Sequence, residues 1–161
     1  MNKNTEIKAR IGDWNLTCER AEGMSDSPRV TLRQEDVFFN VPAGRLKLRI
    51  LAPDHGELIY YQRADTAGPK TSNYLIARTP EPDTLRAALA AALGVRGVVR
   101  KERWLYLVGQ TRIHLDQVEG LGAFLELEVV LGPDDTPEHG QVIAERLMQR
   151  LDVRPADLID A

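Results

Sequence analysis

The feature that most constrains this chain is a set of short segments in which charged and apolar residues alternate with a period of two. Such alternation is typical of β-strands that have one face on an apolar core. In the segment 45–51, Arg45, Lys47 and Arg49 occupy one side, and leucine and isoleucine occupy the other. The sequence therefore predicts a protein built mainly from strands.

Matches to the two-residue and 3.6-residue periods, with breaks at Gly, Pro, Asn and Asp clusters, give eight strands and three helices. The expected strands are 5–11, 29–41, 45–51, 57–64, 70–77, 98–108, 111–118 and 124–131. The expected helices are 14–21 with Asp13 as N-cap, 84–93 with Asp83 as N-cap, and 137–151. Since no linker or internal repeat interrupts this order, we expect one domain over residues 1–161.

Composition narrows the class of protein. With 161 residues and 43% hydrophobic residues, the chain can bury roughly two-thirds of its unfolded surface. Its longest apolar run, 87–93, is far shorter than the ~20 residues of a membrane-spanning helix, so no membrane association is expected. A single cysteine, Cys18, and the absence of an apolar leader segment favour the cytoplasm. A net charge of −3 argues against a nucleic-acid partner.

Five of the predicted strands carry an ionic row on the polar side of the alternation. These rows are Glu6, Lys8 and Arg10; Arg45, Lys47 and Arg49; Lys101 and Arg103; Arg112, His114 and Asp116; and Glu126 and Glu128. They could be solvated outer faces, but such faces usually mix uncharged polar residues with opposite charges across strands. The segregation of sign favours two neighbouring sub-sites, one for a polyanion and one for a cation.

A closed barrel would explain these rows. If eight antiparallel strands close, one side of each strand faces a lumen, and helices can cover the apolar outside. Arginine and lysine in such a lumen would hold phosphate groups by charge-assisted hydrogen bonds. Several carboxylates would hold a hard divalent cation through oxygen ligands. The expected fold is therefore an α+β single-domain barrel, with a site for metal-bound polyphosphate.

The ordered motifs resemble the CYTH superfamily, also called triphosphate tunnel metalloenzymes, over nearly the whole chain. The family's first strand carries Glu-x-Glu-x-Lys, and here Asn4, Glu6 and Lys8 occupy those positions, so the first glutamate is replaced by asparagine. The remaining matches are RLKLR at 45–49, RKER at 100–103, GQTRIHLD at 109–116 and GLGAFLELEV at 120–129.

The resemblance implies roles for individual residues. Metal binding, by Mg²⁺ or Mn²⁺, is implied for Glu6, Glu126, Glu128, Asp116 and Asn4, and catalytic roles for Glu6, Lys8, Asp116 and Glu128. Triphosphate binding is implied for Lys8, Lys47, Arg49, Arg63, Lys101, Arg103, Arg112, Arg45 and Arg10. Arg45 and Arg10 are equally compatible with a tunnel mouth or a solvated surface. His114 is a further candidate proton carrier, and Asp36 could orient a basic residue.

The similarity is greatest to proteins labelled class IV adenylate cyclases, and it also extends to thiamine triphosphatases. It implies a metal-dependent enzyme that acts on a nucleoside or other organic triphosphate, either cyclising ATP or releasing orthophosphate. A non-catalytic polyphosphate-binding protein is the alternative, because Asn4 removes one carboxylate. The expected partner is the triphosphate, with neither nucleic acid nor membrane, and a homodimer is left open.

Overall fold

The computed structural model describes residues 1–160, and in this range nine strands and three α-helices form. The strands are β1 (Asn2–Arg10), β2 (Val30–Phe39), β3 (Arg45–Ala52), β4 (His55–Arg63), β5 (Lys70–Thr79), β6 (Val95–Val108), β7 (Thr111–Val118), β8 (Gly122–Leu131) and β9 (Leu158–Ile159). The helices are α1 (Trp14–Met24), α2 (Pro82–Leu93) and α3 (Pro137–Arg150), and a single 3₁₀ turn spans Pro155–Asp157.

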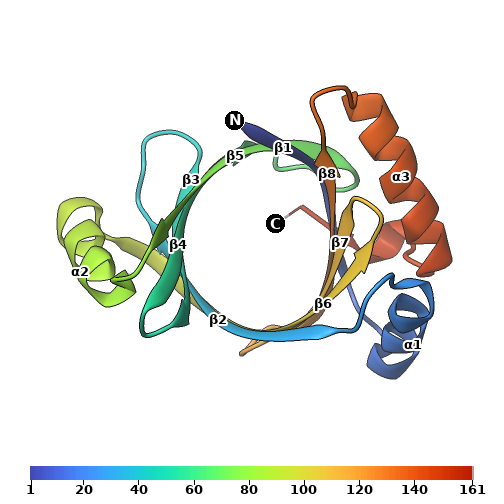
Figure 1. Ribbon diagram of the computed structural model, residues 1–161, viewed down its shortest axis with the longest axis horizontal. Helices are drawn as coiled ribbons and strands as arrows, with labels where there is room; N and C mark the ends of the chain where they lie inside the picture. The colour runs from blue at the N-terminus through green and yellow to red at the C-terminus, as the bar shows by residue number, and fades with distance from the viewer. Residues whose placement is uncertain (161) are drawn as a thin grey trace.

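The sheet closes on itself. The strand order is β5-β4-β3-β2-β6-β7-β8-β1, and β1 also pairs with β5, so every one of these antiparallel strands has two neighbours. Figure 1 looks through the resulting ring, with the helices outside it. The short β9 continues the seam: it pairs with β1 at Lys8 and Ala9, just beyond the last β1–β5 pair at Glu6. The predicted closed barrel is confirmed.

The main core lies between the barrel wall and two helices. The outward-facing residues of β1, β7 and β8 are fully buried; they include Ile7, Ile113 and Leu127. They lie on the side of the barrel that α1 and α3 cover (Figure 1). On the other side, α2 packs over β2, β3 and β4, with Val37, Phe39 and Leu48 beneath it. Apolar side chains thus face out of the barrel toward the helices, which leaves the charged rows facing the lumen.

Gly140 explains how closely α3 can approach the wall. A Cβ atom at this position would lie 2.2 Å from Thr5 Oγ1 and 2.8 Å from Leu131 Cδ2. Glycine therefore permits contact between the helix backbone and the strands β1 and β8. These two strands carry the acidic rows, so α3 braces one wall of the lumen.

The structure differs from the sequence expectations at several element ends. The predicted N-cap at Asp83 is wrong, because α2 begins at Pro82 and its N-cap is Glu81. Proline favours the first position of a helix, since its ring fixes φ at a helical value. The first helix runs on to Met24, three residues beyond its predicted end. The ninth strand has two residues, which is too short for an alternation to reveal.

Candidate functional site

Neighbouring strands bring the ionic rows into contact inside the barrel. In the β1–β8–β7 ladder, Glu6 pairs with Glu128, which in turn pairs with Arg112. One step along the strands, Lys8 pairs with Glu126, which pairs with His114. Since side chains at directly paired positions lie on the same face of a sheet, these rows form one continuous charged wall.

Glu6, Glu126 and Glu128 make the acidic part of the wall. Glu6 is 8% exposed, and burial, together with the charges of Glu126 and Glu128, raises its pKa to about 7. Arg63 opposes this effect, since its Nη1 lies 3.2 Å from Glu6 Oε1. Although burial alone would raise the pKa of Glu126, the guanidinium of Arg103 holds it well below its usual range. The wall therefore contains Glu6, whose pKa lies near neutral pH, beside Glu126, which stays ionised at that pH.

Strands β2, β3 and β6 carry a cationic wall built around Asp36. Arg49 donates two hydrogen bonds to this carboxylate, at 2.9 and 3.1 Å, while the ammonium groups of Lys47 and Lys101 each lie 3.9 Å from it. These three cations hold the pKa of Asp36 far below its usual range, even though burial alone would raise it. Desolvation, with the neighbouring guanidinium groups of Arg49 and Arg103 respectively, lowers the pKa of Lys47 and of Lys101 to about 8.

Asp116 binds Arg103 as Asp36 binds Arg49. The Arg103 guanidinium donates to both Asp116 oxygens at 2.8 Å and to Glu126 Oε2 at 3.4 Å. Asp116 is 1% exposed, and Lys101 Nζ lies 3.5 Å from it. Both of its oxygens are thus engaged by cations, which makes Asp116 an orienting carboxylate for Arg103 in this arrangement.

Asn4 lies where the family motif has its first glutamate. Its side chain is 3% exposed, and its Nδ2 donates to Glu128 Oε2 at 3.5 Å. Among residues 1–160, no hydrogen-bond partner reaches Asn4 Oδ1. A buried amide oxygen without a partner is costly in a protein interior, and it is also a neutral ligand for a hard cation.

His114 faces the same carboxylates. Its Nε2 lies 3.3 Å from Glu128 Oε1, and ligand atoms of His114, Glu126 and Glu128 all lie within 4.8 Å of one another. Burial and the nearby Arg103 charge lower the pKa of the imidazole well below its usual value, so the ring is neutral near pH 7. A neutral ring can coordinate a cation, whereas the lowered pKa makes it a weak proton acceptor near pH 7.

These observations test whether a divalent cation suits the wall. Three carboxylates gather on two adjacent strands, their mutual repulsion contributes to the raised pKa of Glu6, and the buried Asn4 oxygen lacks a partner within the described residues. Oxygen donors of this kind are what Mg²⁺ and Mn²⁺ require. The residues present therefore fit such an ion.

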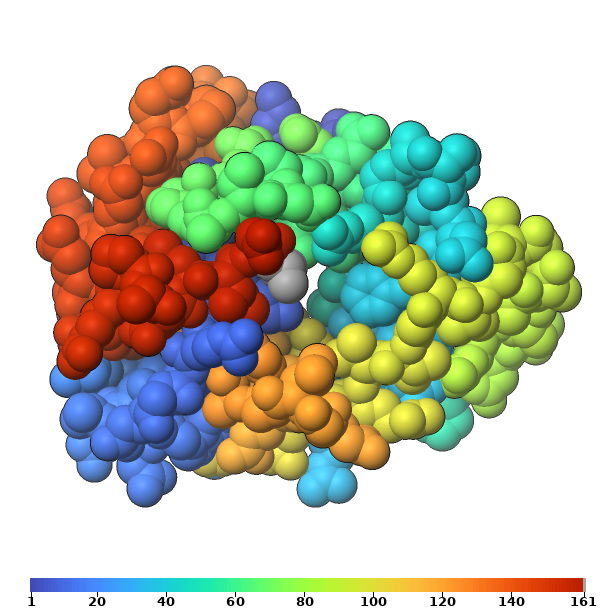
Figure 2. All heavy atoms as spheres, turned by 180° about the vertical axis from the view of Figure 1, so that it is seen from behind, coloured from blue at the N-terminus to red at the C-terminus, as the bar shows by residue number. Residues whose placement is uncertain are grey.

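The remaining basic residues lie toward one mouth of the barrel. Lys8 and Arg10 lie over the ring of Phe124, with Nζ and Cζ at 5.5 and 5.9 Å from its centroid. Arg45 pairs with Asp65 in the loop after β4, and Arg10 is exposed. Figure 2 shows this end of the molecule hollowed at its centre, beside the red C-terminal segment. Arg45 and Arg10 are thus residues of the mouth.

Lys70 and Tyr61 belong to the lumen as well, although no sequence motif marked them. Lys70 pairs across the seam with Glu6 and is 7% exposed. The centroid of the Tyr61 ring lies 5.1 Å from Lys47 Nζ. No inner and outer side was predicted from the sequence for these two strands. Their contribution depends on the pairing of β5 with β1, which the sequence pattern does not specify.

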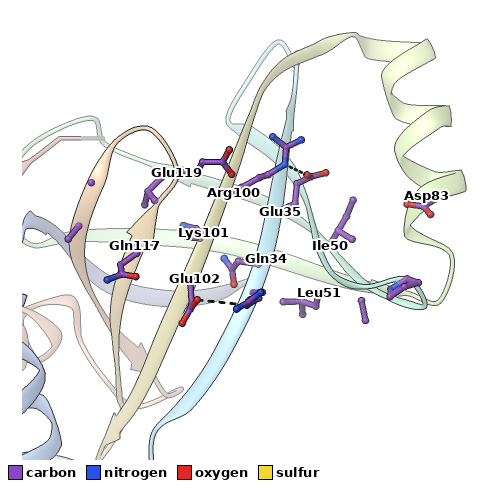
Figure 3. Close-up of a pocket in the computed structure, with 16 residues that line it drawn as sticks. Gln34, Glu35, Ile50, Leu51, Asp83, Arg100, Lys101, Glu102, Gln117 and Glu119 are labelled. Atoms are coloured by element: carbon purple, nitrogen blue, oxygen red, sulfur yellow. Dashed lines mark hydrogen bonds and ion pairs between the residues drawn. The ribbon is translucent and has the colours of Figure 1, made fainter.

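A larger depression lies elsewhere, on the outer wall. It has a volume of about 1040 Å³ and lies between the start of α2 and the β7–β8 turn. Figure 3 shows Glu35 and Arg100 paired there, across β2 and β6. Its ion pairs are those of a solvated outer face, but its lining also includes Gln34 and Lys101, which pair with each other on the lumen side of β2 and β6.

A closed antiparallel barrel with carboxylates facing arginine and lysine inside it defines a class of tunnel protein. The CYTH domain model matches residues 2–160, and the chain belongs to this family. A Methanocaldococcus jannaschii protein named "Putative adenylate cyclase" is 28% identical over 155 residues, covering 88% of this chain and 84% of that protein.

Two solved structures illustrate the likeness in fold. The PH1012 protein of Pyrococcus horikoshii superposes with a TM-score of 0.86 at 24% identity, covering 98% of this chain and 95% of its own. The Hippeastrum protein HpAC1 superposes with a TM-score of 0.64 at 16% identity, covering 100% of this chain and 91% of its own. At these identities the likeness concerns the fold.

Proposed function

We propose that this chain is a divalent-metal-dependent enzyme that converts a nucleoside triphosphate to a cyclic nucleotide and pyrophosphate, as an adenylate cyclase does. One observation carries the proposal: in a single enclosed lumen, Glu6, Glu126 and Glu128 are brought together with Arg63 and Arg103. The Methanocaldococcus relative supports the proposal, because that protein is named a putative adenylate cyclase. A site that pairs carboxylates with guanidinium groups is suited to a phosphate chain that carries its own cation.

The protein's part in such a reaction is positioning and charge neutralisation. Lys47, Arg49, Lys101 and Arg103 would bind the phosphate oxygens, with Asp36 and Asp116 holding the two guanidinium groups in place. A divalent cation on Glu6, Glu126, Glu128 and the Asn4 oxygen would neutralise phosphate charge and polarise the oxygens bound to it.

In the cyclase reaction the ribose 3′-oxygen forms a bond to the α-phosphorus, the bond from that phosphorus to the bridging oxygen breaks, and pyrophosphate leaves. The hydroxyl proton would pass to solvent water, because Glu6, whose pKa is raised to about 7 by burial and by Glu126 and Glu128 in the metal-free protein, would be held ionised as a ligand of the cation. Lys8, on the next inward position of the same strand, would bind the departing pyrophosphate.

A triphosphatase is the second candidate, and the open mouth beside the basic residues favours it, because water can reach a terminal phosphate there (Figure 2). The Hippeastrum neighbour is described as having a dominant triphosphatase activity. In this version water attacks the terminal phosphorus and orthophosphate is released.

The test is to incubate the purified protein with ATP, thiamine triphosphate or tripolyphosphate, each with Mg²⁺ or Mn²⁺, and to separate cyclic AMP, pyrophosphate and orthophosphate. Cyclic AMP with pyrophosphate supports the cyclase. Orthophosphate without cyclic nucleotide supports the triphosphatase instead. No product, together with a raised melting temperature in tripolyphosphate, would indicate a binding protein.

Glu128→Ala separates catalysis from binding. An enzyme should lose turnover by at least about a hundredfold while tripolyphosphate still raises its melting temperature. Glu119→Ala is the matched control, since Glu119 is an exposed residue on the outer groove. Equal activity in both variants would contradict a role for the acidic wall.

A further inference from the structure

Arg49 and Arg103 each donate two hydrogen bonds to an orienting carboxylate in the lumen, but their surroundings differ in charge. Arg103 donates to two carboxylates, Asp116 at 2.8 Å and Glu126 at 3.4 Å. Among residues 1–160, the carboxylate of Asp36 is the only one within 4.0 Å of the Arg49 guanidinium nitrogens. Two negative charges thus offset the charge of Arg103, and a single one offsets that of Arg49.

Gln34 occupies the place of a second carboxylate beside Arg49. It pairs with Lys101 on the lumen side of the sheet, two residues before Asp36 on β2, and it is 4% exposed. The amide orientation that satisfies its hydrogen bonding turns the oxygen toward Arg49, with Nε at 3.0 Å and Nη2 at 3.2 Å. Asp36 accepts from the same two nitrogens, at 2.9 and 3.1 Å. One anionic and one neutral acceptor therefore hold the same edge of the guanidinium group.

This arrangement leaves the other edge of Arg49 for a ligand. A guanidinium group carries five N–H donors, and within the described residues the hydrogen bonds of Arg49 run from Nε and Nη2 and not from Nη1. The ammonium groups of Lys47 and Lys101 each lie 3.9 Å from the same Asp36 carboxylate. Three cations thus surround Asp36, so positive charge remains here for a phosphate oxygen.

We propose that Gln34 is a positioning residue for Arg49, which it holds in place without neutralising its charge, so that Nη1 can donate to a phosphate oxygen. The inference rests on the proposed function and adds a residue that no sequence motif marked. A neutral acceptor suits this position, because a second carboxylate would repel the phosphate chain. By the same reasoning Arg103, beside two carboxylates, attracts a phosphate less strongly than Arg49 does.

Gln34→Glu changes the charge beside Arg49 at nearly constant shape. Arg49 and Lys101 should keep the new carboxylate ionised, so the melting temperature of the ligand-free protein should stay the same or rise. Calorimetric titration should nevertheless show that tripolyphosphate affinity falls at least about tenfold. A variant that merely loses structure would lose both stability and affinity.

Gln62→Glu is the matched control, because it adds the same charge at an exposed position on the outer side of β4. It should leave tripolyphosphate affinity within about twofold of the wild-type value. Unchanged affinity in Gln34→Glu, or an equal loss in both variants, would overturn the proposal.

A double-mutant cycle tests whether Gln34 acts through Arg49. Gln34→Met removes the acceptor and keeps a side chain of similar length, and it should weaken tripolyphosphate binding about fivefold. In an Arg49→Gln background the same change should have no further effect. Equal weakening in both backgrounds would overturn the proposal, because Gln34 would then act independently of Arg49.

The same titrations separate this inference from the proposed function. The expected binding pattern without any turnover would support the role of Gln34 and count against the proposed enzyme. Failure of tripolyphosphate to bind the wild-type protein would overturn both.

Discussion

Opposing electrostatic effects act on the pKa of Glu6 in the lumen. It lies against Arg63, yet burial and two neighbouring glutamates raise its pKa from an ordinary 4.5 to about 7. Between these two values the folded chain binds more protons than the unfolded chain. Stability contributed by this group is therefore present at low pH and is lost as pH rises through about 7.

The first prediction concerns this titration. In a chelator-containing buffer, the melting temperature of the wild-type protein should fall between pH 5 and pH 8, and Glu6→Gln should flatten the fall because it removes the titrating group. Glu119→Gln, on the outer surface, should keep the wild-type slope. A pH profile that is identical in wild type and Glu6→Gln would show that Glu6 is not the group responsible.

The second prediction concerns Lys47 and Lys101, whose pKa values are lowered to about 8 by burial and neighbouring guanidinium groups. A bound anion favours their charged forms, so tripolyphosphate affinity should weaken as pH rises from 7 to 9.5. Replacing both with arginine, which stays charged, should reduce this loss. Lys3→Arg, at an exposed position, serves as control in calorimetric titrations, and an unchanged pH profile in the double variant would refute the assignment.

At the scale of elements, the sequence pattern predicted eight strands, and the alternation of charged and apolar residues predicted the inner and outer sides of five of them. Strand 111–118 was placed without error, because Gly109 and the Gly120–Gly122 turn mark both ends. The pattern did not identify which strands meet at the seam, so the neighbourhood of Lys70 and Glu6 was not foreseen. The orienting pairs Asp36–Arg49 and Asp116–Arg103 also depend on side-chain geometry, which periodicity does not specify.

The third prediction tests how α3 braces the barrel. Gly140→Ala should lower the free energy of unfolding by about 1–3 kcal/mol, because the new methyl group would collide with Thr5 and Leu131. Gly23→Ala, in α1, meets no atom within 4 Å and should raise stability by up to about 1 kcal/mol. Urea denaturation of both variants measures the contrast. Equal effects would mean that α3 does not approach the wall this closely.

For the whole molecule, the net charge of −3 does not show that basic and acidic side chains gather together in the lumen. None of the helices within residues 1–160 is long and apolar enough to span a membrane. The described ion pairs divide into those of the lumen and those of the outer face, such as Arg33–Glu102, whose arginine side chain is 87% exposed. If the protein binds a polyanion, the lumen is therefore the expected place, and the overall charge is not the cause.

The fourth prediction follows from this distribution. Tripolyphosphate at ~100 times its dissociation constant should stabilise the fold by about 2.7 kcal/mol, which corresponds to a rise of roughly 5–10 °C in melting temperature for a chain of this size. Arg49→Gln should lose most of this shift, whereas Arg33→Gln should retain it. An equal shift in both variants would place the bound anion on the outer surface.

The charged site of this protein depends on closure of the barrel at the seam between β1 and β5. Glu6 pairs with Lys70 on one side and with Glu128 on the other, so the three glutamates come together only after β1 has joined β8, near the other end of the chain, and Lys70 joins them only after β1 has also paired with β5. Such long-range pairings are slow to form. A newly made chain should therefore acquire its affinity for polyphosphate in one late step, with no partly active precursor before it.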